Sequence, residues 1–187
     1  MTSSSIVRAT LDDLYRVEGK AELIGRRVVH QMASGVLPSV VAGEIFVSLR
    51  AYSKAVGRGT AFPDGIGYAV PELPSERESF SPDASYHAGT WPANRMRFME
   101  GPPTFAAHVR SENDYGAAAD AEIEAKRADY FAAGTLVVWD VDPRAETVTS
   151  YRASEPNLPR VFRRGEIADA EPAVPGWRMG VADVFAA

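Results

Sequence analysis

The chain has 187 residues, of which 45% are apolar and 24% are charged, with no cysteine and a formal net charge of −5. This composition is typical of an ordinary globular protein, and the length predicts a single domain over residues 1–187 with a sizeable core. The missing cysteines exclude disulfides, thiolate metal sites and cysteine nucleophiles, and the acidic balance argues against a generally basic surface for nucleic acid.

The first predicted elements are a short helix and a hairpin. Thr10 and Asp13 form a capping-box pattern, which predicts a helix over about 10–17. The β-branched residues that follow, on both sides of a Gly-Arg pair, predict two strands at 20–24 and 27–31 joined by a tight turn.

The first long helix is predicted over 37–56, because apolar residues recur there at helical spacing and Gly57 follows as a stop. Two short strands, 60–62 and 66–70, are expected around a Pro-Asp-Gly turn. The next segment, 71–80, is polar and is predicted to be a loop.

The second half of the chain reads as strand, helix, strand. Strands are predicted at 83–88 and 104–110, followed by an alanine-rich helix over 114–133 and a nearly continuous apolar strand at 135–141. The strands before and after this helix should be parallel, with the helix buried against the sheet.

The remaining segments predict an antiparallel extension at 146–152 and 160–164, and a small terminal helix at 181–185. The order of elements indicates the α/β class, with a mixed sheet flanked by helices, an N-terminal hairpin and a C-terminal antiparallel extension.

A set of polar residues stands at the ends and on the faces of these strands. Strand side chains alternate, so residues 108 and 110 share one face of their strand, which Asp83 can join from a neighbouring strand. Lys126, on the following helix, can reach the same place. A carboxylate pair with a lysine suits phosphodiester cleavage, because the acids hold a hard cation and the lysine steadies charge on the phosphate.

The spacing of these residues resembles the Uma family of putative restriction endonucleases, a branch of the PD-(D/E)XK phosphodiesterase superfamily. Members show Pro-Asp, then Glu-Val-x-Ser on a strand, then Lys and Tyr four residues apart, then Gly and a strand ending near Asp-Pro. This chain matches with Pro82-Asp83, His108-Val-Arg-Ser111, Lys126 with Tyr130, Gly134 and Trp139 to Pro143. Only the glutamate departs, since His108 stands in its place.

The resemblance implies a restriction-endonuclease-like fold and a metal-dependent DNA endonuclease. Asp83 and His108 would ligate a divalent metal, Mg²⁺ or Mn²⁺, and Lys126 would stabilise the phosphate, so that Asp83, His108 and Lys126 are the predicted catalytic residues. It also implies DNA as a partner and a homodimer as the assembly.

The histidine weakens the expected activity. Imidazole binds Mn²⁺ or Zn²⁺ readily and Mg²⁺ poorly, and the exchange removes a negative charge that attracts the cation. We therefore expect hydrolysis to be weakened or lost. The alternative function is a non-catalytic dimerising or ligand-binding module that retains the nuclease fold.

Each of the three candidate residues also has a structural interpretation. Asp83 after a proline can cap a strand or close a turn, and His108 can be a buried histidine that bonds a backbone carbonyl. Lys126 stands four residues after Glu122, which predicts an ordinary ion pair on the helix surface.

Four further residues are secondary candidates. Glu22 and Glu44 are rivals for an additional acid near the metal, although a solvated glutamate at the hairpin edge is the favoured interpretation of Glu22. His87 can enter the metal shell, and Arg110 can clamp phosphate without acting as a base.

Two residues near the helix are given structural roles, and the chain carries no membrane signal. Ser111 and Asp114 are expected to cap the helix that follows them. No unbroken apolar run approaches the roughly 20 residues that span a bilayer, and the first residues lack a basic region followed by an apolar one. We therefore expect a cytoplasmic protein with no membrane partner.

Overall fold

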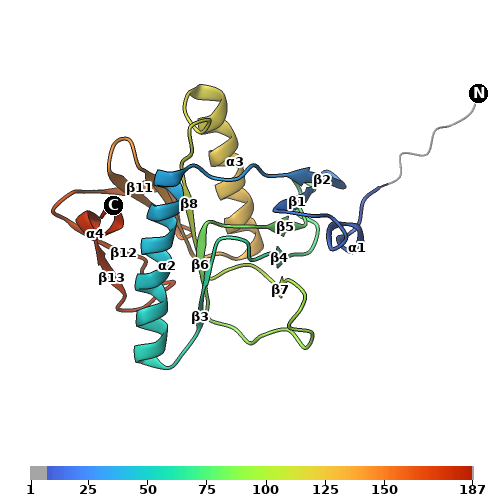
Figure 1. Cartoon of the computed structure of the whole chain (residues 1–187), viewed down its shortest axis with the longest axis horizontal. Helices are drawn as coiled ribbons and strands as arrows, with labels where there is room; N and C mark the ends of the chain where they lie inside the picture. The colour runs from blue at the N-terminus through green and yellow to red at the C-terminus, as the bar shows by residue number, and fades with distance from the viewer. Residues whose placement is uncertain (1–7, 187) are drawn as a thin grey trace, which may run out of the picture.

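A six-stranded mixed sheet forms the centre of the computed structural model, which describes residues 8–186 (Figure 1). Its strand order is β11-β10-β9-β8-β6-β3, and only the central pair β8 and β9 is parallel. The strands on one side of this pair are β6 (Ala84–His87) and β3 (Thr60–Pro63). The α/β class and the mixed sheet flanked by helices are confirmed.

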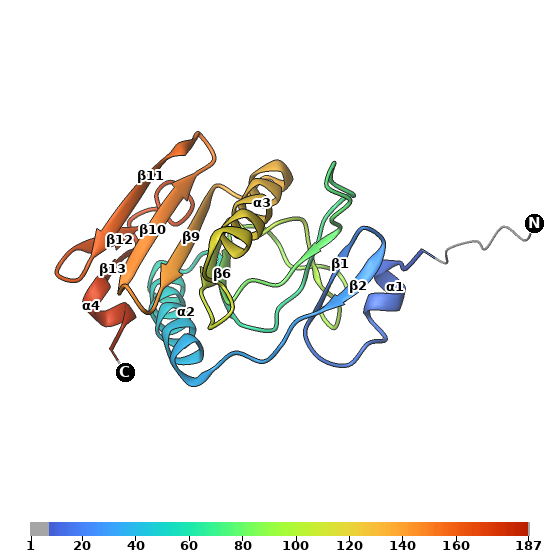
Figure 2. The ribbon, with the colours of Figure 1, turned by 90° about the horizontal axis from the view of Figure 1, so that it is seen from above.

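The parallel pair is joined by a helical crossover, as the sequence predicts. Strand β8 (Phe105–Val109) leads to α3 (Ala117–Ala133), which ends at Gly134 in the left-handed conformation and is followed by β9 (Val137–Asp142). Figure 2 shows α2 (Val36–Val56) and α3 on opposite sides of the sheet strands. Gly57, with a φ of 66°, ends α2 as predicted.

The N-terminal segment lies at one end of the molecule, away from the C-terminal strands (Figure 2). Helix α1 (Leu11–Leu14) is shorter than predicted, but Thr10 and Asp13 form the predicted capping box. Strands β1 (Ala21–Ile24) and β2 (Arg27–His30) pair in antiparallel register, which confirms the hairpin.

The middle of the chain differs from the prediction. Strands β3 and β4 (Tyr68–Ala69) do not pair with each other, because β3 joins the large sheet and β4 lies in a small sheet of its own. The partners of β4 are β5 (Ser79–Phe80) and β7 (Met99–Glu100). The predicted loop 71–80 therefore ends in the strand β5. This strand has only two residues, too few for a recognisable strand pattern in the sequence.

The C-terminal part extends the sheet. Strands β10 (Thr147–Arg152) and β11 (Glu155–Arg163) form the predicted antiparallel extension, and α4 (Val181–Val184) is the predicted terminal helix. The sequence did not indicate the short pair β12 (Ile167–Asp169) and β13 (Arg178–Gly180).

The two faces of the central strands have different neighbours. On β8, Phe105, Ala107 and Val109 belong to the main core, which also contains α2 and the C-terminal segment. Ala106 belongs to a second, smaller core with Phe80 and Tyr130. Because strand side chains alternate, His108 projects to the side of the sheet opposite the main core.

Helix α3 covers this second side only loosely. Tyr130 is its one buried residue, and its ring stacks on Phe80 with centroids 4.1 Å apart. The prediction that this helix is buried against the sheet therefore holds only for its C-terminal end, where Tyr130, Phe131 and Ala133 pack on the second core. A space between α3 and the sheet follows from this loose packing, and it is the largest cavity described below.

Helix α2 is unusually apolar for a helix with so much exposed surface. By length and composition alone it is long and apolar enough to cross a membrane, although its apolar residues do not form one unbroken run. Val41, Ile45 and Leu49 are fully buried against the sheet, whereas Val36 and Val47 on its outer surface are 85% and 58% exposed. Because Val41, Ile45 and Leu49 pack in the main core, α2 is an integral part of this fold.

Candidate functional site

A cleft of about 940 Å³ lies between α3, the hairpin region and the open side of the sheet. Asp83, His108 and Lys126, which come from three separate segments, all line it. The structure thus brings the three predicted residues to one cavity, and their chemical roles stay predictions.

Asp83 stands just before β6 and is surrounded by donors. Its Oδ2 accepts a hydrogen bond of 2.8 Å from the backbone N–H of Val109, and its Oδ1 accepts one of 3.0 Å from Lys20 Nζ. Burial raises the pKa of the carboxyl, but His108, Lys20 and the Val109 N–H more than offset this, so the pKa lies well below its ordinary value. The side chain is therefore a carboxylate at neutral pH.

His108 contacts Asp83 directly. Its Nδ1 is 3.4 Å from Asp83 Oδ2, and its Nε2 is 3.9 Å from Asp114 Oδ2. Nε2 is buried and has no hydrogen-bond partner among residues 8–186. The imidazole is thus held beside the acid that it was predicted to join, with one polar atom left unsatisfied.

Lys126 reaches the cleft through a buried network of charges. Its Nζ donates a hydrogen bond of 2.8 Å to Oε1 of Glu22, which also accepts one from the backbone N–H of Ser81. Arg77 donates to the other oxygen of Glu22 and to Asp129. Burial raises the pKa of Glu22, but the charges of Lys126 and Arg77 outweigh it and keep the pKa below its ordinary value.

Two interpretations from the sequence are wrong at this network. Glu22 is only 2% exposed, so it is not a solvated glutamate at the hairpin edge. The ion-pair partner of Lys126 is Glu22, 104 residues away, in place of Glu122 one turn earlier. Both follow from the packing of strand β1 close to β5, which carries Glu22 under the cleft.

Arg110 does not lie free to clamp phosphate. Its guanidinium makes two hydrogen bonds to Asp140, of 2.8 and 2.7 Å, and one to Asp120. Asp140 is the register partner of His108 on the neighbouring strand. Arg110 therefore ties β9 to the start of α3, and its donors are used within the chain.

Ser111 and Asp114 close a turn, and they do not cap α3. The Asp114 carboxylate accepts from both the N–H and the hydroxyl of Ser111, at 2.6 and 2.7 Å. The residue that precedes α3 is Gly116, which makes no side-chain cap. The expected cap is thus wrong by a few residues, and the turn places Asp114 beside the imidazole of His108.

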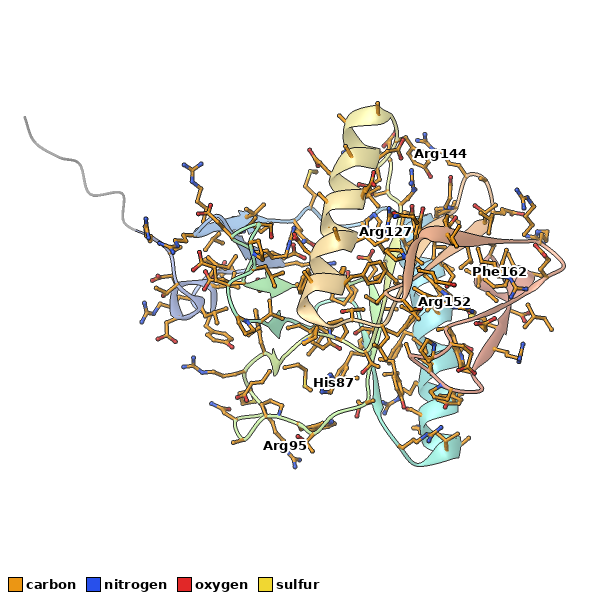
Figure 3. The ribbon with its side chains drawn as sticks, turned by 180° about the vertical axis from the view of Figure 1, so that it is seen from behind. His87, Arg95, Arg127, Arg144, Arg152 and Phe162 are labelled. Atoms are coloured by element: carbon orange, nitrogen blue, oxygen red, sulfur yellow. The ribbon has the colours of Figure 1, made fainter. Side chains whose placement is uncertain are left out.

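The other secondary candidates lie outside the cleft. His87 is at the far end of β6 from Asp83, where its Nδ1 is 3.3 Å from the carbonyl of Pro102. Figure 3 shows His87 well apart from Arg127 on α3. Glu44, on α2, lines neither this cleft nor the smaller cavity beside it.

Lys20 is the site residue that the sequence did not reveal. Its Nζ lies 2.5 Å from Asp64 Oδ1 and 3.0 Å from Asp83 Oδ1, so one ammonium bridges two carboxylates. Burial lowers the pKa of Lys20, but the two acids outweigh this effect and the pKa is raised. A lysine just before a strand gives no signal of partners 44 and 63 residues later.

The arrangement of these side chains does not fit a divalent metal. Within residues 8–186 no group of three or more His, Asp or Glu side chains is arranged to hold one ion. Both oxygens of Asp83 accept hydrogen bonds from the chain, and so do both oxygens of Glu22. The chain's own cations and N–H groups therefore stand where a metal ion would need free oxygen ligands.

Comparison with known families and structures gives two matches. A family model described as "Uma2: Putative restriction endonuclease" matches residues 9–182. The crystal structure of a putative nuclease belonging to DUF820 from Anabaena variabilis is similar in fold, with a TM-score of 0.73, 17% sequence identity, and coverage of 94% of this chain and 97% of that chain. No curated protein was found to match this chain in sequence.

Proposed function

Because this chain belongs to the Uma2 family of putative restriction endonucleases, we propose that it is a DNA endonuclease in which Mg²⁺-dependent hydrolysis is strongly weakened. The observation that carries the proposal is the position of His108, which contacts Asp83 at 3.4 Å where the family has a glutamate. The site keeps its aspartate and its lysine but lacks one of the two acids that a divalent cation needs.

The basic lining of the cleft supports an anionic substrate such as nucleic acid. Basic residues from several segments line it, including Lys20, Arg77, Lys126 and Arg127. Acidic residues line it as well, Asp83, Asp114 and Asp129 among them. This mixed charge predicts weak binding of nucleic acid that becomes weaker at higher salt.

Lys126 and Asp83 have different roles in the proposed reaction. Lys126 is held at the cleft by Glu22 and stabilises charge on the phosphate of the DNA backbone. Asp83 lines the same cleft, and contacts from His108, Lys20 and the Val109 N–H hold its pKa below the ordinary value, so it stays ionised. Neither Arg110 nor Lys126 is placed as a base, since Arg110 is always protonated and Lys126 is ion-paired.

The variant His108→Glu tests the proposal. We expect it to nick supercoiled plasmid in Mg²⁺ about a hundredfold faster than the wild-type chain, which is worth about 2.7 kcal/mol of barrier. Adding Asp83→Ala to this variant should abolish the gain, and EDTA should do the same. Equal and absent nicking by the wild-type chain and by His108→Glu would contradict the proposal.

A second candidate function is favoured by one observation. The two acids of the site, Asp83 and Glu22, are already neutralised by cations of the chain itself, which suits a module that keeps the fold and has given up the reaction. The expected homodimer belongs to this candidate too, since the outer surface of α2 exposes Val36 and Val47. Failure of His108→Glu to gain activity would favour this function. Cytoplasmic residence is part of both proposals.

A further inference from the structure

We propose that Lys20 is a built-in counterion, whose ammonium takes the place of a divalent cation between Asp64 and Asp83 and keeps metal ions away from the Oδ1 side of Asp83. The inference rests on the proposed function for the importance of Asp83. It concerns the Oδ1 side of this carboxylate, whereas His108 lies on the Oδ2 side.

The ammonium group of Lys20 lies between two carboxylates, as a bound cation would. One nitrogen contacts Oδ1 of Asp64 at 2.5 Å and Oδ1 of Asp83 at 3.0 Å, and the lysine side chain is only 18% exposed. The two acids come from distant segments, the turn after β3 and the residue before β6. A positive charge is therefore needed between them, because two carboxylates so close to one centre repel each other.

A small cavity lies beside the two carboxylates that Lys20 bridges. A cavity of about 170 Å³ is lined by Asp64 and Asp83 together, and also by Ser34 and Ser39 near the start of α2. Hard divalent cations in proteins are commonly held by one or two carboxylates with waters completing the shell. Loss of the lysine charge would leave two acids facing a cavity with room for those waters.

The charge of Lys20 stands in the way of a metal ion. Its ammonium lies between Asp64 and Asp83, in contact with one oxygen of each. A divalent ion would have to displace it or approach a like charge at short range, and both are unfavourable. The lysine thus occupies the Oδ1 side of Asp83.

The test is a calorimetric titration with Mn²⁺, without nucleic acid, of the wild-type chain, Lys20→Gln and Lys20→Met. We expect both variants to bind Mn²⁺ with a Kd at least about tenfold lower than the wild-type chain, a change of about 1.4 kcal/mol. Asp83→Asn added to Lys20→Gln should reverse the gain. Lys54→Gln, on the exposed end of α2, is the matched control and should bind like the wild-type chain.

Several results would overturn the inference. The inference is wrong if Lys20→Gln and Lys20→Met fold and bind Mn²⁺ no more tightly than the wild-type chain. Loss of the folded state in both variants, followed by circular dichroism, would give the lysine a purely structural role. Tight binding by the wild-type chain that Asp83→Asn removes would show that the ammonium excludes nothing. A gain of nicking by His108→Glu without these binding gains would refute this inference alone.

Discussion

Arg77→Met is expected to lower the free energy of unfolding by about 3–5 kcal/mol, the range found when one partner of a buried ion pair is removed. Arg77 and Glu22 are 9% and 2% exposed, and Arg77 also donates 2.9 Å to Asp129. Methionine fills part of the volume but leaves Asp129 without this donor and Glu22 with one cation in place of two. Denaturation by urea at neutral pH measures the change.

The matched control is Arg164→Met, which removes an arginine from a solvent-exposed pair with Glu146. Exposed pairs contribute little to stability, so this variant should unfold at nearly the same urea concentration as the wild-type chain. Equal urea midpoints for Arg77→Met, Arg164→Met and the wild-type chain would show that the buried network does not hold the hairpin against the cleft.

Lys126→Gln, made in the His108→Glu background, is expected to reduce Mg²⁺-dependent nicking about a hundredfold, the usual effect of losing one donor to a charged transition state. The glutamine can still bond Glu22, whose charge remains balanced by Arg77. The loss should appear in kcat more than in KM, because the lysine acts on charge that develops during the reaction. Single-turnover nicking assays measure it.

Two further variants separate chemistry from folding at this position. Lys126→Arg keeps the positive charge and should recover part of the activity, whereas Lys54→Gln should have no effect. A reduction by Lys126→Gln of less than about twofold, far short of the loss expected for a missing donor, would remove Lys126 from the site.

Much of the fold was predictable because its signals are local. The helical spacing of apolar residues and a following glycine predict α2 and α3. The apolar run at β9 predicts a strand buried on both faces. The crossover from β8 to β9 followed from the order of the elements. The sequence does not predict the short strands β5, β7 and β12, because two or three residues are too few to show the alternation of apolar and polar residues that marks a strand.

Three residues of the candidate site were predictable from the sequence, but the residues that pair with them were not. The spacing of Asp83, His108 and Lys126 indicated that they share a cleft, and they do. Their partners come from 63 and 104 residues away, at Lys20 and Glu22, and no local pattern reveals such contacts. A lone acid in a strand is usually solvated, but Glu22 is buried, as are Ala21 and Leu23 on either side of it.

The most direct test of the account is a pair of crystals, wild type and His108→Glu, soaked in Mn²⁺ and measured for anomalous scattering around Asp83. We predict a peak beside Asp83 Oδ2 and the introduced carboxylate in the variant, and none there in the wild-type chain. A peak of equal strength in both crystals, or no peak in the variant, would contradict the claim that the histidine at position 108 is what weakens this site.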